Sequence, residues 1–309
     1  MEKKILITGS NGLLGQKLAF IFSQSDYYDL LLTSRQPESV FGKDSPPYLS
    51  VNMTNKKDVV AVVQEFSPHI IINASAMTDV DGCELHKEQA WQSNVLAIEN
   101  IVSAAKKGTH IVHYSTDYIF DGVAGPYDEI AIPNPISYYG RTKLASENVL
   151  WGSGHQFTIL RTMVLYGVGK NVKQNFALWL VKMLREEKPM RIVDDQTGNP
   201  TFVDDLAYAT LKTIELEKNG LYNIAGAEIV SRYDFALALA KIFHYNAKLI
   251  TPVKTRELQQ RAPRTLCSGL LTLKAETQLG ISPCNILRGI EHFKHQLELF
   301  EQSLLLNIR

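Results

Sequence analysis

Short apolar runs of strand length alternate along the first half of the chain with segments whose apolar residues recur at helical spacing. The runs expected to be strands are Ile5–Thr8, Asp29–Ser34, Tyr48–Val51, His69–Ile72, Thr109–Tyr114 and Phe157–Leu160. Between them the spacing predicts helices at Leu13–Ser23, Lys56–Glu65, Lys87–Lys107 and Tyr139–Leu150. Nearly all-apolar strands that alternate with helices are typical of a parallel sheet covered on both faces. The pattern therefore predicts an α/β fold built on a doubly wound parallel sheet.

After Arg161 the alternation loosens. Helices are expected at Val172–Arg185, Val203–Glu217 and Ser231–Phe243, with short extended pieces between them and scattered short helices after Tyr245. We expect residues 1–165 to form the sheet domain, with 203–225 returning to it. Residues 166–202 and 226–309 are expected to form a smaller α+β lobe that binds the substrate.

Three glycines follow the first expected strand at a spacing of three residues. Gly9 allows the chain to turn, Gly12 lets an anion approach the backbone, and Gly15 lets the next helix pack closely. The free amides at the start of that helix, from Leu13 and Leu14, then face the anion. This stretch predicts a Rossmann-like dinucleotide site, although a glycine-rich turn without a ligand has the same spacing.

Composition excludes several classes of partner. The 309 residues carry no net charge, with 32 basic and 32 acidic side chains, so no electrostatic footprint for nucleic acid or an anionic membrane is present. No run is apolar and long enough to span a bilayer, and the N-terminus leads directly into a strand. Three widely spaced cysteines suit small core positions in a reducing compartment, and we expect a cytoplasmic protein without a metal site.

Two further stretches carry candidate chemistry. Tyr139 and Lys143 lie four residues apart at the start of an expected helix, on one face, where an ammonium group would lower the pKa of the phenol. An exposed Tyr–Lys pair would have the same spacing. Thr116 and Asp117 follow the strand Thr109–Tyr114, at the end where open α/β sheets bind ligands. Their side chains could equally close the strand in a local turn.

Taken together, these stretches resemble the extended short-chain dehydrogenases/reductases. The resemblance rests on the three glycines, Asn73-Ala74-Ser75-Ala76, Ser115-Thr116-Asp117-Tyr118 and the Tyr139–Lys143 pair. Within that family the chain is similar to the dTDP-4-dehydrorhamnose reductase branch from Lys3 to about Pro283. The motifs that indicate the branch are Phe120-Asp121-Gly122, Leu160-Arg161-Thr162, Val193 to Thr201 and Asp205-Leu206-Ala207.

The resemblance implies a reduction. A nicotinamide would deliver hydride to the C4 keto carbon of a nucleotide-linked 6-deoxy sugar, and Tyr139 would protonate the oxygen. Thr116 would hydrogen-bond that oxygen, Asp117 would meet the sugar, and Lys143 would hold the nicotinamide ribose. Asn94 matches a helix asparagine that supports a proton relay through Lys143, although a structurally satisfied amide would look the same. The implied cofactor-binding residues are Gly9, Gly12, Leu13, Leu14, Gly15, Ser34, Arg35, Asn52, Met53, Ala74, Ser75, Ala76, Ser115, Tyr139 and Lys143.

The end of the second strand indicates which nicotinamide cofactor is used. An acidic residue there would favour NADH, whereas this chain has Ser34 and Arg35, which can bind a 2′-phosphate. We therefore expect NADPH, with NADH possible if Arg35 instead stacks on adenine or is solvated.

Several basic residues have two alternative roles. Lys17 stands where some family members have a glutamate of a magnesium-bridged dimer, so we expect no metal-linked dimer but a monomer or a homodimer. Lys170, Lys173, Arg261 or Arg264 could meet the diphosphate of the substrate, or could be solvated loop residues.

Two other functions fit the same scaffold. A sugar-nucleotide dehydratase or epimerase is one, but dehydratases place an acidic pair after the threonine, and Tyr118 follows Asp117 here. The other is a non-catalytic regulatory subunit similar to the β subunit of methionine adenosyltransferase, which binds a partner enzyme.

Overall fold

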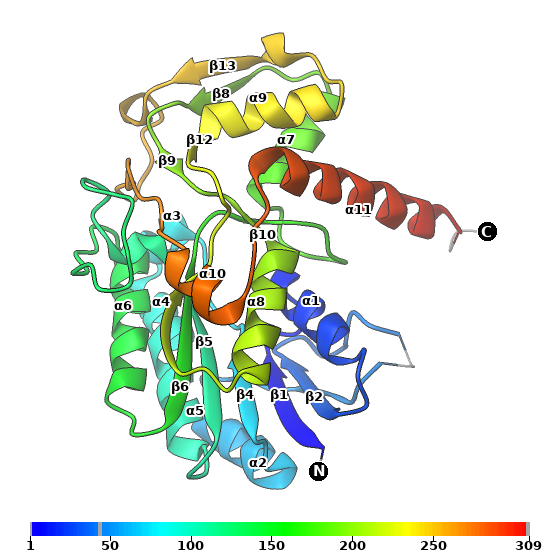
Figure 1. The fold of residues 1–309 in the computed structure, drawn as a ribbon, viewed down its shortest axis with the longest axis vertical. Coiled ribbons are helices and arrows are strands. Elements are labelled where there is room, and N and C mark those ends of the chain that lie inside the picture. The colour runs from blue at the N-terminus through cyan, green and yellow to red at the C-terminus, as the bar shows by residue number, and fades with distance from the viewer. Residues whose placement is uncertain (1, 43–44, 307–309) are drawn as a thin grey trace.

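A seven-stranded parallel sheet forms the centre of the molecule, in the order β3-β2-β1-β4-β5-β6-β11 (Figure 1). The computed structural model describes residues 2–42 and 45–306, with the backbone alone for 304–306. The predicted domain ranges also include residues 1, 43–44 and 307–309, which lie outside the described residues. The strands of the sheet are β1 (Lys3–Thr8), β2 (Tyr28–Ser34), β3 (Tyr48–Ser50), β4 (Ile70–Asn73), β5 (His110–Thr116), β6 (Gln156–Thr162) and β11 (Gly220–Asn223). The prediction of a doubly wound parallel sheet is confirmed.

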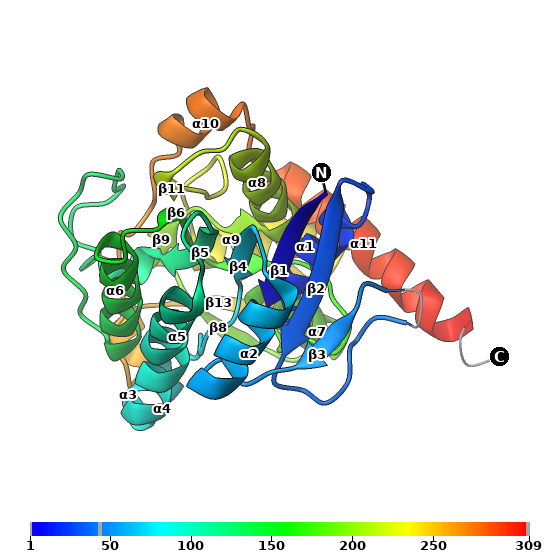
Figure 2. The same ribbon diagram turned by 90° about the horizontal axis from the view of Figure 1, so that it is seen from below.

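Helices cover both faces of this sheet, which explains why its strands are apolar on both sides (Figure 2). One face packs against α1 (Leu13–Phe22), α8 (Val203–Glu215) and α10 (Leu273–Leu279). The other packs against α2 (Lys56–Phe66), α5 (Ala97–Ala104) and α6 (Tyr138–Trp151). In β1 the side chains alternate between the two clusters, since Ile5 and Ile7 belong to the first and Leu6 to the second.

A third buried cluster forms above the carboxyl ends of the strands (Figure 1). It is built from α7 (Phe176–Arg185), α9 (Arg232–Ile242) and α11 (Ile286–Leu306) around the parallel pair β8 (Met190–Val193) and β13 (Ile250–Val253). Two further pairs complete the lobe: β7 (Leu165–Tyr166) with β10 (Thr201–Phe202), and β9 (Thr197–Gly198) with β12 (Val230–Ser231). Three single turns are η2 (Asp117–Ile119), η3 (Ala247–Leu249) and η4 (Thr255–Glu257).

The predicted helix Lys87–Lys107 is wrong in one respect, because it is not continuous. It divides into α4 (Lys87–Trp91), a π-helical turn η1 (Gln92–Leu96) and α5, and it is preceded by α3 (Val80–Leu85), which was not predicted. The buried side chain of Asn94 explains the wider turn, since it bonds the backbone of Met77 rather than facing solvent.

Two predictions in the second half are also wrong. The helix expected from Val172 begins only at Phe176, because the side chain of Asn175 caps it by accepting from the amide of Leu178 at 3.1 Å. Short helices were expected after Tyr245, yet α11 runs for 21 residues. Ile290, Phe293 and Leu297 bury its apolar stripe in the third cluster, and this packing stabilises the long helix.

The order of the strands fixes where a ligand can bind. β1 and β4 are neighbours in the sheet. From β1 the chain continues to β2 on one side, and from β4 it continues to β5 on the other side. A crevice opens at such a point beyond the carboxyl ends. The segments that follow β1 and β4, with those after β5 and β7, therefore surround one location.

Candidate active site

Two adjoining cavities lie beyond the carboxyl ends of β1, β2, β4 and β5. The first, of about 280 Å³, reaches from the glycine turn to the ends of β2 and β3. The second, of about 590 Å³, extends from the same turn past the end of β5 to α6 and α9. They share as lining residues Gly12, Ala74, Ser75, Ala76, Val172 and Lys173. Every residue that was expected to bind cofactor or substrate lines one of the two, or both, so the fold brings all of them to one groove.

The glycine turn has the geometry that a bound pyrophosphate needs. Gly9 has a φ of +67°, and a Cβ there would come within 2.8 Å of the backbone of Ala74. The turn can therefore lie against the segment after β4 only because residue 9 lacks a side chain. α1 begins directly after Gly12 without a side-chain cap, which leaves its first amides open toward the groove. This chain thus fits a dinucleotide at the position that the motif predicts.

The first cavity is open and polar at its far end. Arg35 is exposed and has no ion pair or side-chain hydrogen bond among the described residues, whereas Ser34 Oγ lies 2.7 Å from the hydroxyl of Tyr48. Asn52 lines this cavity beside Met53, which is buried. Sequence reasoning missed Asn11 here, whose amide donates to Gln36 Oε1 at 2.6 Å and so fixes the loop after β2.

The second cavity holds the expected catalytic residues. Thr116 ends β5, and its hydroxyl donates to Asp117 Oδ1 at 3.0 Å and accepts from the amide of Tyr118 at 3.2 Å. Tyr139 lies in the first turn of α6, and its ring packs edge-on against that of Tyr118, with 5.7 Å between centroids. A Cβ on Gly140 would lie 2.1 Å from the Tyr118 carbonyl oxygen, so this glycine allows α6 to approach the turn that carries Thr116.

The expected effect of Lys143 on Tyr139 is not found, and that prediction is corrected. Burial raises the pKa of Tyr139 well above its usual value, the charge of Asp117 raises it further, and the Thr116 hydroxyl acts in the opposite direction. Lys143 instead lies with Nζ 3.2 Å from His113 Nε2. The phenol is therefore protonated at neutral pH, which is the state that a general acid requires before it donates.

Lys143 is itself buried, with 3 % of its surface exposed. Burial lowers its pKa from 10.5 to about 8, and the neighbouring carboxylate of Glu147 counteracts part of that change. Glu147 forms a bidentate ion pair with Arg161 at 2.9 and 2.7 Å, equally buried. The buried charges of Glu147 on α6 and Arg161 on β6 thus neutralise each other.

A chain of buried hydrogen bonds links the cofactor side of the groove to Lys143. Asn73 Oδ1 accepts from the hydroxyls of Thr8 and Ser75, each at 2.7 Å, so its amide nitrogen must donate to His113 Nδ1 at 3.1 Å. His113 then carries its proton on Nε2 and donates to Ser146 Oγ at 2.9 Å. Ser146 donates in turn to the carbonyl oxygen of residue 143 at 2.6 Å. Burial, and the charge of the lysine, lower the pKa of His113 well below 6.5, so the ring is neutral.

Two residues that the resemblance assigned are held by neighbouring side chains. Asp117 lines the cavity but is 2 % exposed, and its other oxygen accepts from Ser268 Oγ at 2.6 Å. Burial raises its pKa. The amide of Asn94 donates to the Met77 carbonyl at 3.1 Å and to the Thr142 hydroxyl at 2.9 Å, so it is structurally satisfied. Its role in a proton relay stays a prediction.

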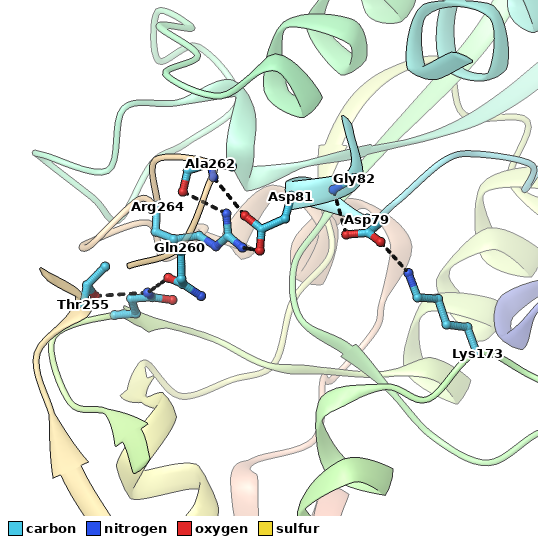
Figure 3. A network of polar contacts seen from close by, with 9 residues as sticks. Asp79, Asp81, Gly82, Lys173, Thr255, Gln260, Ala262 and Arg264 are labelled. Atoms are coloured by element: carbon cyan, nitrogen blue, oxygen red, sulfur yellow. Dashed lines mark hydrogen bonds and ion pairs between the residues drawn. The ribbon is translucent and has the colours of Figure 1, made fainter. Parts of the chain in front are cut away.

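The uncertain basic residues take different positions. Lys173 lines both cavities, whereas Lys170, Arg261 and Arg264 line neither. Arg264 is paired with Asp81 at 2.7 Å (Figure 3), which leaves it engaged away from the groove. Lys17 is paired with Asp204 at 3.0 Å.

Arg232, which sequence reasoning missed, lines the second cavity and contacts the ring of Phe176 at 5.2 Å. Its only sequence signal is its place directly after Ser231, the helix cap that was predicted and is confirmed.

The remaining candidate chemistry is limited. Within residues 2–42 and 45–306, no three His, Cys, Asp or Glu side chains are arranged to hold a metal ion. No helix in the same part of the chain is long and apolar enough to cross a bilayer. All three cysteines are free, and of the three only Cys83 is buried, so the core positions expected for Cys267 and Cys284 are corrected to half-buried ones.

Comparisons with known proteins agree with this geometry. The family described as "RmlD substrate binding domain" matches residues 3–299. A dTDP-4-dehydrorhamnose reductase of Aggregatibacter actinomycetemcomitans is 30% identical over 96% of this chain and 99% of its own. Methionine adenosyltransferase 2 subunit beta of Xenopus laevis is 30% identical over 82% of this chain and 75% of its own. The crystal structure of a Bacillus anthracis dTDP-4-dehydrorhamnose reductase in complex with NADP superposes with a TM-score of 0.85 and 29% identity, over 95% of this chain and 99% of that one.

Proposed function

This chain belongs to the RmlD substrate binding domain family, and on that premise we propose that it is an NADPH-dependent reductase of a nucleotide-linked 4-keto-6-deoxy sugar. The substrate that we propose is dTDP-4-dehydrorhamnose, which the name of the Aggregatibacter relative also carries. Reduction of its C4 keto group would give dTDP-rhamnose.

One observation carries the proposal: a single cavity contains the start of α1 and the side chains of Thr116, Tyr139 and Lys143. A dinucleotide that lies along the groove from Arg35 to Gly12 would place its nicotinamide at these three side chains. When bound, that nicotinamide supplies a hydride. The protein has to hold the keto sugar, orient its carbonyl and supply one proton.

The three residues divide that work. The Thr116 hydroxyl donates its one hydrogen to Asp117 in this structure; turned toward the substrate, it would donate that hydrogen to the carbonyl oxygen and so orient it. Tyr139, protonated because burial raises its pKa, donates its phenolic proton to the oxygen as negative charge develops there. Lys143, which lines the same cavity, would hold the ribose of the cofactor.

NADPH is favoured over NADH by the far end of the first cavity. Arg35 presents a guanidinium group without a partner among the described residues, and Ser34 lies next to it. A guanidinium group binds a phosphate through two parallel hydrogen bonds, so the 2′-phosphate of NADPH fits this corner. The Bacillus relative was crystallised with NADP, which supports the same choice.

The test is the oxidation of NADPH in the presence of freshly prepared 4-keto-6-deoxy sugar nucleotides with different bases and sugars. We expect loss of the reduced nicotinamide absorbance with at least one of them, the dTDP sugar first. No oxidation with any member of the panel, by protein that binds NADPH, would contradict the proposal.

A second function is supported by the likeness to methionine adenosyltransferase 2 subunit beta. In that case the chain would bind a partner enzyme without turning over a sugar. The presence of Thr116, Tyr139 and Lys143 in one cavity favours catalysis. Affinity purification that brings down a stoichiometric partner enzyme, together with no turnover on the panel, would decide for the regulatory function.

Three further points belong to the proposal. We place the protein in the cytoplasm, which the three free cysteines support. We expect a monomer or a homodimer. We divide the chain into a dinucleotide-binding part, 1–165 with 203–225, and a substrate-binding part, 166–202 with 226–309. The assignment of 203–225 to the first part is supported by β11, which is a strand of the sheet, and by α8, which packs on the sheet. In the second part, α10 also packs on the sheet.

A further inference from the structure

The segment between β7 and α7 crosses the groove where its two cavities meet. We call residues 169–175 the strap. Val172 and Lys173 line both cavities, Asn171 lines the first, and Gln174 and Asn175 line the second. The lining that the two cavities share on the other side is Gly12 and the segment after β4, where the pyrophosphate is expected. The strap therefore lies opposite the glycine turn.

One end of the strap is fastened to α1. The side-chain amide of Gln16 donates to the carbonyl of Lys170 at 2.8 Å and accepts from the amide of Lys170 at 2.9 Å. The same amide group also donates to the carbonyl of Asn11 in the glycine turn at 2.9 Å. The strap and the turn thus share one anchor, which fixes the distance across the groove.

The other end is fixed as well, since Asn175 caps α7 and its side-chain amide donates to the carbonyl of Gly167 at 2.9 Å. Between the two ends, the strap has one weak contact. Lys173 Nζ lies 3.3 Å from Asp79 Oδ2 at the start of α3, as Figure 3 shows, and the two side chains are 71% and 51% exposed. An exposed ion pair of this kind contributes little to stability. Asp79 has a second function that does not need the lysine, since its Oδ1 caps α3 by accepting from the amide of Gly82 at 3.0 Å.

From these contacts we infer that Lys173 binds the pyrophosphate of the dinucleotide, exchanging Asp79 for it. The uncapped start of α1 attracts an anion to one side of the groove, and Lys173 supplies the positive charge on the other. A phosphate oxygen in a partly enclosed groove is a better partner for an ammonium group than an exposed carboxylate. This inference rests on the proposed function, because it requires a bound dinucleotide.

The test measures the Kd of NADPH by fluorescence titration for three variants. Lys173→Met should raise the Kd about tenfold, the loss expected when a charge-assisted hydrogen bond is removed. Lys170→Met is the matched control, since it removes the same charge from the same strap at a side chain that lines neither cavity, and it should change the Kd by less than about twofold. Asp79→Asn keeps the helix cap and frees the lysine, so NADPH should bind equally well or more tightly.

Three results would overturn the inference. Equal losses for Lys173→Met and Lys170→Met would show a general charge effect. A loss for Asp79→Asn as large as that for Lys173→Met would show that the ion pair only supports the structure. If Lys173→Met weakens binding of UDP or dTDP, measured by calorimetry, and leaves NADPH unchanged, the lysine belongs to the substrate site. In all three cases, normal binding of NADPH by the unchanged protein would still be consistent with the proposed function. If the unchanged protein does not bind NADPH at all, both the inference about Lys173 and the proposed function are contradicted.

Discussion

The two ends of the groove are built in different ways. At the catalytic end, Thr116 and Lys143 are 5 % and 3 % exposed, and Thr116 is held by a hydrogen bond to Asp117. At the adenosine end, Arg35 is exposed, and where the two cavities meet, the strap is held to α3 by one surface ion pair. Proton transfer requires groups fixed to within a fraction of an ångström, whereas charge recognition of a phosphate tolerates movement. The difference indicates that this protein keeps rigidity for chemistry and leaves adjustable contacts for binding.

The largest effect should come from the phenol at the rigid end. Tyr139→Phe should lower turnover about 1,000-fold, because it removes the proton donor, while the Kd of NADPH should change by less than about twofold. Steady-state kinetics and a fluorescence titration measure the two quantities. Tyr138→Phe is the matched control, since it makes the same change one residue earlier on α6 at a side chain outside both cavities. Turnover within tenfold of the unchanged protein would remove Tyr139 as the acid.

A second effect at the rigid end concerns stability. The pKa of Lys143 is lowered to about 8 in the folded protein from 10.5, so the folded state binds fewer protons than the unfolded state between these values. The free energy of unfolding should therefore rise with pH across that window, and burying the charged lysine should cost most below it. Lys143→Met should raise the free energy of unfolding at pH 7 by about 2 kcal/mol and remove this pH dependence, while turnover is lost.

Denaturant unfolding at pH 7 and pH 9.5 measures this difference for both proteins. The same change between the two pH values in the variant would show that the dependence arises from another group. A variant that is less stable at both values would show that the ammonium group is stabilised by its surroundings.

The smallest effect should come from the adjustable end. Arg35→Ala should raise the Kd of NADPH about tenfold and that of NADH by less than about twofold, because only NADPH carries the 2′-phosphate. The two titrations of one variant serve as each other's control. Equal losses for both cofactors would show that Arg35 contacts the adenine ring instead. The protein would then be able to use NADH as well as NADPH.

Much of the fold could be predicted because its strands are defined by local composition. Ile5 to Thr8 and the buried run from Leu30 to Thr33 can only be strands of a sheet covered on both faces, and the glycine turn fixes where the first helix starts. The hydrophobic pattern gives the wrong element where the local structure depends on contacts with residues far away in the sequence. The π-helical turn depends on Asn94 reaching Met77, and α11 depends on a cluster assembled from six other elements.

The candidate site shows the same limit. Motifs identified the residues around the groove, since each one lies directly after a predicted strand or at the start of a predicted helix. They could not show that Lys143 is directed to His113, because that contact depends on how α6 packs against β5. Nor could they identify Arg232, which reaches the cavity from a helix in the other lobe.

The hydrogen-bonded histidine has a consequence for the whole centre. Both ring nitrogens of His113 are committed, one as acceptor and one as donor, so an added proton has no free lone pair to occupy. Acid would have to rotate the Asn73 amide, and with it the two hydroxyls that hold the amide, before the imidazole could charge. His113 therefore keeps its neutral state through modest changes in pH. In an NMR titration the signals of this ring should stay still while those of solvent-exposed histidines move.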